Sequence, residues 1–128
     1  ILVNRWQYNF GTPQRGDVVV LRFPGDPEHK KYIKRIVGLP GEHIKILDGY
    51  VFVNNQRLNE SYIPVGILTA PNVNRVLRDD DYFLLGDNRY NSSDSRVWGI
   101  CPKRDLIGKA WFTIYPLDLW GEVKEAKY

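Results

Sequence analysis

The sequence predicts an all-β fold, with an antiparallel β core and a small β insertion. Short apolar, β-branched runs alternate with turns rich in Gly, Pro, Asp and Asn. No long stretch carries an apolar period of 3.6 residues, so no long helix is expected. The 128 residues, 43% of them hydrophobic and 26% charged, suit one folded domain that needs no disulfide.

Each expected strand lies between clear turn signals. We expect strands at 18–23, 32–37, 44–47, 50–53, 82–85 and 106–115. The first follows the turn Gly16-Asp17 and ends at Pro24, and the last ends at Pro116. Asp48-Gly49 lies between two alternating runs and predicts a tight hairpin.

The remaining segments define how the strands are grouped. Residues 59–76 carry two prolines, a glycine and several asparagines, so we expect a loop there. A single helical turn is expected within 102–106, where a proline begins the segment. Residues 1–39 and 77–128 should form the main β core, and residues 40–76 the small insertion that caps it.

Lys34 is the first candidate functional residue, because it lies inside an apolar strand. Alternation puts Lys34 on one face with Tyr32 and Ile36, and the other residues of the strand on the opposite face. Burial disfavours the charged form of an amine and can lower its pKa by several units, as a general base near neutral pH requires. A simpler interpretation is a lysine whose stem covers apolar surface while its amine stays in water. The strand alone leaves both interpretations open.

The polar segment 86–96 is the second candidate. It reads Gly-Asp-Asn-Arg-Tyr-Asn-Ser-Ser-Asp-Ser-Arg and so combines turn-forming side chains with hydroxyls and carboxylates. Asp94 and Arg96 are spaced so that they can pair and fix the loop. A buried strand precedes the segment and the apolar run 97–100 follows it, and anchored polar loops often carry functional groups. A surface loop with an internal ion pair is the simpler interpretation.

Other site chemistries find little support in the sequence. The net charge is +3, and no clustered basic stripe with aromatics is visible, so we expect no nucleic-acid partner. No histidines or cysteines have metal-ligand spacing and no glycine-rich phosphate loop is present, so we expect no metal and no cofactor. The single cysteine, Cys101, is interpreted as a small buried residue. No run approaches the ~18 apolar residues that span a bilayer.

Three segments, taken together, resemble the characteristic boxes of bacterial type I signal peptidases. They are 15–21, the lysine box 32–42 and the final box 86–96. Proteins of this family are membrane-anchored serine proteases that use a Ser–Lys dyad. The resemblance covers almost the whole chain. Tyr90 stands where the family often has a small polar or acidic residue, a change beside the site.

The resemblance implies a role for each matching residue. Lys34 would be the general base, and Ser92 would hydrogen-bond to its amine and orient it. The supporting residues would be Asp87, Asp94 and Arg96. The residues that help line pockets for small side chains before the cleavage point would be Tyr32 and Ile33.

The resemblance also implies a fold, a substrate and a location. The fold would be signal-peptidase-like, which is related to that of SOS-repressor proteases, with the substrate strand docked on a sheet edge. The partners would be the signal peptides of preproteins, cleaved after Ala-x-Ala-like small residues. The catalytic domain would lie on the extracytoplasmic face of the bacterial plasma membrane, held by an N-terminal anchor.

One departure concerns the nucleophile. In the family, the reactive serine lies in a Ser-Met-x-Pro-type box shortly before a strand that resembles residues 1–5. The serines of this chain are at 61, 92, 93 and 95, and none has that context. We therefore expect the nucleophilic serine and the anchor to precede Ile1, and the chain to be inactive alone.

Two alternatives stay open at this point. One is a self-cleaving Ser–Lys protease domain of the SOS-repressor type, although the composition of 86–96 argues against it. The other is a non-catalytic module that binds peptides or docks on membranes, with an interfacial surface supplied by tryptophans. The tryptophans are Trp6, Trp98, Trp111 and Trp120. Core packing is the simpler role for Trp98 and Trp111.

Overall fold

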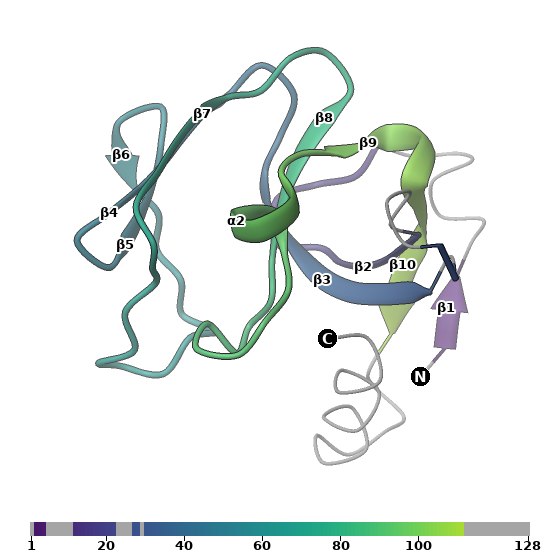
Figure 1. The fold of residues 1–128 in the computed structure, drawn as a ribbon, viewed down its shortest axis with the longest axis horizontal. Helices are drawn as coiled ribbons and strands as arrows, with labels where there is room; N and C mark the ends of the chain where they lie inside the picture. The colour runs from purple at the N-terminus through teal and green to yellow at the C-terminus, as the bar shows by residue number, and fades with distance from the viewer. Residues whose placement is uncertain (1, 5–11, 23–26, 29, 112–128) are drawn as a thin grey trace.

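Two antiparallel sheets form the fold in the computed structural model, which describes residues 2–4, 12–22, 27–28 and 30–111. The larger sheet has the strand order β1-β10-β2-β3-β8-β9 and the smaller one β6-β5-β4-β7 (Figure 1). The strands of the larger sheet are β1 (Leu2–Asn4), β2 (Val18–Arg22), β3 (Lys31–Gly38), β8 (Asp81–Leu85), β9 (Cys101–Pro102) and β10 (Leu106–Trp111). Those of the smaller sheet are β4 (His43–Leu47), β5 (Tyr50–Val53), β6 (Gln56–Arg57) and β7 (Val73–Val76). The predicted all-β class is confirmed.

The larger sheet draws its strands from both ends of the chain, and the smaller sheet from the middle. β3 leads into β4 at the turn around residues 39–42, and β7 returns to β8 through residues 77–80. One apolar cluster joins the sheets, since Val37 and Phe83 of the larger pack with Ile44 and Val51 of the smaller. The division into a core and a separate capping insertion stays a prediction.

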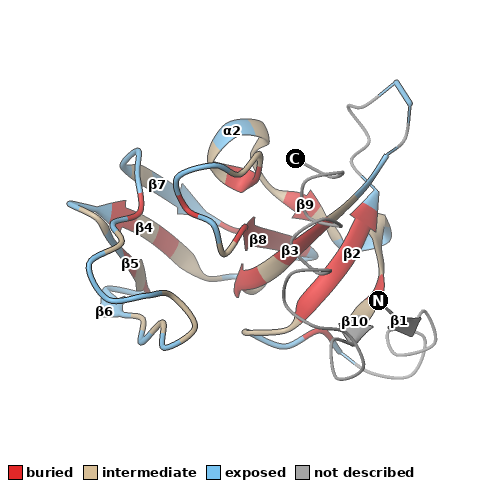
Figure 2. Ribbon diagram, turned by 90° about the horizontal axis from the view of Figure 1, so that it is seen from below, coloured by how far each residue is buried: buried red, intermediate tan, exposed pale blue. Residues whose placement is uncertain are grey.

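Strand β3 runs through the most buried part of the larger sheet, between β2 and β8 (Figure 2). Its register with β2 places Lys34 opposite Val19. Ile36 and Tyr32 belong to the cluster around β2, whereas Val37 belongs to the cluster shared with the smaller sheet. The predicted separation of the two faces of this strand is therefore confirmed.

Two elements differ from the sequence expectation. Residues 73–76 form strand β7, so the expectation of a loop through residue 76 is wrong at its end. β7 pairs with β4 through its backbone while its side chains are mostly exposed, so it lacks the apolar alternation that identifies strands. The helix α2 (Ser95–Trp98) was also not expected, and its start is capped by Asp94, whose carboxylate accepts from the backbone N–H of Arg96.

Other expectations can be compared directly. The single turn predicted within 102–106 is present as a 3₁₀ turn at Lys103–Asp105. Trp98 is half-buried against the cluster around β2, with its ring centroid 6.5 Å from that of Tyr32, which agrees with core packing. The expected strand ends at 23 and 112–115, the turn at 24–26, Pro116, Trp6 and Trp120 lie outside the described residues, as does the side chain of Trp111.

Candidate active site

Lys34 and Ser92 meet in space although they lie 58 positions apart along the chain. The Lys34 side chain is among the largest fully buried ones, with 1% of the residue exposed. Its Nζ lies 2.9 Å from Ser92 Oγ, within hydrogen-bonding distance. Nζ also lies 5.8 Å from the centre of the Tyr32 ring, on the same face of β3. Lys34 is thus buried in the structure, and the simpler interpretation, that its amine stays in water, is wrong.

The ion pair between Asp94 and Arg96 fixes the loop that carries Ser92. Asp94 is fully buried, and the Arg96 side chain is 4% exposed. Arg96 donates to Asp94 through Nε at 2.9 Å and Nη2 at 2.7 Å, and the backbone N–H of Gly86 donates to the same carboxylate at 2.9 Å. Arg96 also donates to the carbonyl of Arg89. The two ends of the segment 86–96 are therefore tied to each other.

Ser95 has a structural position in the same segment. Its Oγ accepts from the backbone N–H of Leu84 in β8 at 2.9 Å, and the residue is buried. The start of α2 is thereby joined to the larger sheet.

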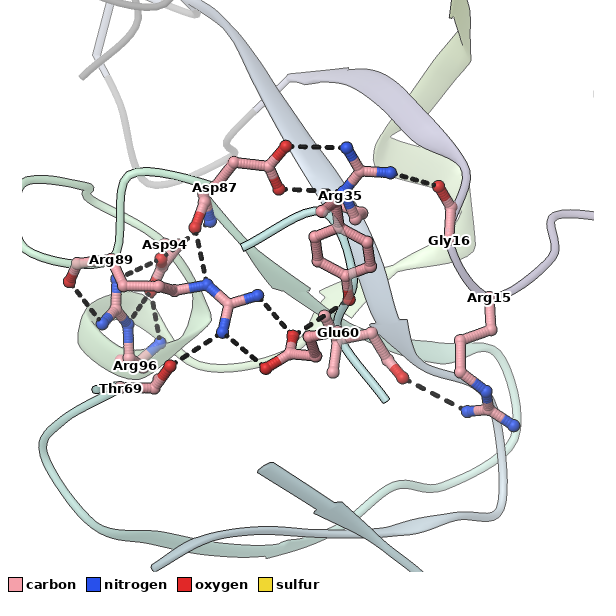
Figure 3. A network of polar contacts seen from close by, with 12 residues as sticks. Arg15, Gly16, Arg35, Glu60, Thr69, Asp87, Arg89, Asp94 and Arg96 are labelled. Carbon is pink, nitrogen blue, oxygen red and sulfur yellow. Dashed lines mark hydrogen bonds and ion pairs between the residues drawn. The ribbon is translucent and has the colours of Figure 1, made fainter. Parts of the chain in front are cut away.

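Asp87 supports the site from the opposite face of β3. Arg35 donates to both carboxylate oxygens of Asp87, at 2.8 and 2.7 Å, and to the carbonyl of Gly16 at 2.9 Å (Figure 3). Burial opposes the charge on the Arg35 guanidinium, but the hydrogen bonds and charge of Asp87 prevail and the pKa of Arg35 is raised. Because Arg35 follows Lys34 in β3, this pair fixes the strand next to the candidate base.

Arg89 is a further part of the site that the sequence interpretation did not single out. Its side chain is 0% exposed and donates to the carbonyl of Gly86, to Thr69 Oγ1 and to both oxygens of Glu60. The Glu60 contacts are 3.0 and 2.6 Å long, a bidentate pair of the kind that fixes geometry most firmly (Figure 3). Glu60 and Thr69 come from the loop before β7. Residues outside the three sequence boxes therefore help to hold the 86–96 loop.

The two predicted pocket residues lie on opposite faces of β3. Tyr32 is half-buried beside Lys34 and Trp98, on the face that carries the amine. Ile33 is 2% exposed and points to the other face. The structure thus brings Tyr32 to the Lys34–Ser92 pair and leaves the role of Ile33 as a prediction.

Chemically, the arrangement offers a buried amine and a partly buried hydroxyl in hydrogen-bonding contact. Such an amine–hydroxyl pair is suited to proton transfer during acyl transfer. Within the described part of the chain, no group of His, Cys, Asp and Glu could hold a metal ion. The Cys101 thiol is unsuited to nucleophilic attack, because burial raises its pKa to about 12.

Comparisons with known proteins agree on one family. The family model described as "Signal peptidase, peptidase S26" matches residues 1–115. A relative named "Probable signal peptidase I-1" from Synechocystis is 36% identical over 96% of this chain and 65% of the relative. "Signal peptidase I" from Leptolyngbya laminosa is 35% identical over 96% of this chain and 63% of the relative. The chain thus spans less than two thirds of the length of these curated relatives.

A solved structure gives the same result for the fold. The crystal structure of a signal peptidase I from Enterococcus faecalis superposes with a TM-score of 0.69 and 26% sequence identity. The match covers 79% of this chain and 98% of that structure. The named relatives and the solved structure favour this family over the SOS-repressor proteases and over a non-catalytic module.

Proposed function

The chain belongs to the signal peptidase family, peptidase S26, and from that premise we propose that it is the catalytic domain of a type I signal peptidase. This enzyme is a serine endopeptidase that removes N-terminal signal peptides from exported preproteins. The observation that carries the proposal is the buried Lys34 amine, 2.9 Å from the Ser92 hydroxyl. The amine lies where a general base is needed, and the loop that holds its partner is fixed at both ends.

In the proposed reaction, Lys34 is neutral in the resting enzyme because burial disfavours the ammonium form. It takes the proton from a serine hydroxyl as the serine oxygen attacks the carbonyl carbon that follows a small side chain. The C–N bond then breaks, Lys34 returns the proton to the leaving amine, and an acyl-enzyme remains. Lys34 next takes a proton from water as the water oxygen attacks the acyl carbon. The ester C–O bond to the serine then breaks, and Lys34 returns the proton to the serine oxygen, which restores both groups.

We propose that the attacking serine precedes Ile1 and that Ser92 orients the amine. The distance between Lys34 and Ser92 would also suit a nucleophile and its base, so the two roles need an experiment that separates them. Mass spectrometry of a trapped acyl-enzyme locates the acylated residue. In the proposed mechanism the acyl group lies outside residues 1–128, whereas an acyl group on Ser92 would reassign the nucleophile.

The proposed substrate is an extended segment that ends in an Ala-x-Ala-like sequence, with Tyr32 and Ile33 helping to line its pockets. The proposed location is the extracytoplasmic face of the bacterial plasma membrane, with an N-terminal anchor. Among the described residues, none of the helices has the length and apolar character required to cross a bilayer.

The decisive test removes the amine without removing the side chain. In the complete encoded protein, Lys34→Met keeps the length of the side chain, and Lys34→Ala tests the result independently. Cleavage of a preprotein or an Ala-x-Ala peptide should be abolished in both. The matched control is Lys45→Met in strand β4, a half-buried lysine of the smaller sheet, which should cleave normally. Undiminished cleavage by folded Lys34→Met would overturn the proposal.

A further inference from the structure

The loop between β6 and β7 reaches both halves of the candidate site. Glu60 contacts Arg89, which lies in the loop that carries Ser92, and Tyr62 contacts Arg35, which follows Lys34 in the chain. Residues 60–62 are far along the chain from both the lysine box 32–42 and the final box 86–96. Their position therefore calls for a separate explanation.

The first half of the connection is the ion pair between Glu60 and Arg89. The guanidinium is completely buried and the Glu60 side chain is 13% exposed. Arg89 also donates to the Gly86 carbonyl at 2.8 Å and to Thr69 Oγ1 at 2.8 Å. A buried guanidinium cannot lose its proton, so it needs this carboxylate. Glu60 therefore determines where Arg89, and with it the start of the 86–96 loop, can lie.

The second half of the connection is the stacking of Tyr62 on Arg35. The Arg35 guanidinium carbon lies 4.0 Å from the centre of the Tyr62 ring, a close cation–π contact. The Tyr62 hydroxyl donates to Glu60 at 2.9 Å. Burial, and then the charge of Glu60, raise the pKa of Tyr62 above its usual value, so the hydroxyl keeps the proton that it donates. One short segment thus links the two arginines beside Lys34 and Ser92.

Two additional bonds dock the same region on the final box. The backbone N–H of Leu68 donates to the Tyr90 hydroxyl at 3.3 Å, and Arg96 donates to the Ala70 carbonyl at 2.9 Å. The segment 60–70 therefore touches the 86–96 loop at several points. A single contact would be ordinary packing. The segment 60–70 instead contacts both the lysine box, through Arg35, and the final box 86–96, and we call this segment the clamp.

We propose that Glu60 and Tyr62 are positioning residues, which hold the Lys34 amine and the Ser92 hydroxyl in their productive geometry. The inference rests on the proposed function and assigns to the 58–72 loop a role in the rate of proton transfer. Neither residue touches the reacting atoms. Each acts through an arginine, Glu60 through Arg89 and Tyr62 through Arg35.

The test is a double-mutant cycle on the complete encoded protein. Glu60→Gln keeps the size of the side chain but turns a donor toward Arg89. It should lower kcat by about tenfold or more, as expected when catalytic groups are displaced by a fraction of an ångström, and leave KM within about twofold. In a Ser92→Ala background the same change should lower the residual kcat by less than about twofold, because residues that act through one group are not additive.

Asp81→Asn is the control. Asp81 lies outside the three boxes, its side chain is 11% exposed, and it pairs with Arg78 at 3.5 Å and accepts from the Arg78 backbone N–H at 3.1 Å. It contacts neither Arg89 nor Arg35 through these bonds, so kcat should stay within about twofold of the parent. Should Glu60→Gln fail to fold, Tyr62→Phe removes only the hydroxyl, and should lower kcat about threefold with KM unchanged.

The outcomes separate the clamp from the function on which it rests. A folded Glu60→Gln protein with no greater loss of kcat than Asp81→Asn would overturn the clamp, as would a loss that is fully retained in the Ser92→Ala background. In either case the proposed function stands if Lys34→Met abolishes cleavage by an active parent. A parent that cleaves no signal peptide would overturn the function, and the clamp with it.

Discussion

The carboxylate of Asp94 provides the sharpest test of what holds the 86–96 loop together. We consider Asp94→Asn, which keeps the size and shape of a fully buried side chain. Oδ1 accepts from the backbone N–H and Nε of Arg96, and Oδ2 accepts from Gly86 N–H and Arg96 Nη2. In either orientation of the new amide, its NH2 group faces two donors. The substitution therefore removes two hydrogen bonds. It also removes the negative charge that pairs with the Arg96 guanidinium, and it changes no other charge.

The expected cost follows from these contacts. Two hydrogen bonds to a charged group are lost at about 1.5–3 kcal/mol each. Removing one partner of a buried ion pair independently costs about 3–5 kcal/mol. The two routes overlap because they describe the same contacts, so we expect the free energy of unfolding to fall by about 3–5 kcal/mol. This is a large part of the ~5–15 kcal/mol that stabilises a typical domain.

Urea unfolding of the purified protein, followed by tryptophan fluorescence and by circular dichroism, measures this cost. For a slope of about 1.5 kcal/mol per molar urea, the midpoint should fall by at least about 2 M. The exposed Asp79→Asn is the control and should shift the midpoint by less than about 0.3 M. A loss below about 1 kcal/mol for Asp94→Asn would refute the reasoning, because it would mean that the loop is not held by this pair.

Two further predictions concern the core. In Gly38→Ala the added Cβ would lie 2.7 Å from Ile44 Cδ1 and 2.9 Å from Leu77 Cδ1, so stability should fall by about 1–3 kcal/mol by urea unfolding. An unchanged midpoint would show that the sheets separate without cost. Cys101 is 1% exposed with its pKa raised to about 12, so at pH 8 a thiol reagent should label it only as fast as the protein opens. Rapid, complete labelling of the native protein would contradict this.

The central strands and the two boxes were predictable from the sequence because their signals are local. Apolar alternation and the Asp-Gly turn identify β4 and β5 within one residue of their observed bounds. Lys34 was noticeable because an amine within an apolar run is costly to bury, and Asp94 and Arg96 because they are two residues apart. In each case, the physical cause is contained in a few consecutive residues.

The clamp could not be predicted in the same way, since its contacts are long-range and its residues look ordinary. Glu60 and Arg89 are separated by 29 positions, and Arg35 and Asp87 by 52. Glu60 and Tyr62 lie in a segment rich in proline and asparagine, which reads as an exposed loop. Strand β7 could not be predicted for a related reason. It forms by backbone pairing with β4, and its side chains are mostly exposed, so the sequence shows no apolar alternation there. Only the folded arrangement brings these partners together.

The kinds of cation at the site suggest why a lysine and not an arginine holds the central position. Arg35, Arg89 and Arg96 each donate to a carboxylate through two nitrogens. A guanidinium keeps its proton under any condition that a folded protein survives, so burial of these three groups requires acidic partners. An amine can instead lose its proton when it is taken out of water, and the neutral amine then accepts one from a hydroxyl. The arginine pairs therefore supply a fixed frame, and Lys34 is the one cation of this set whose chemistry permits it to exchange a proton within that frame.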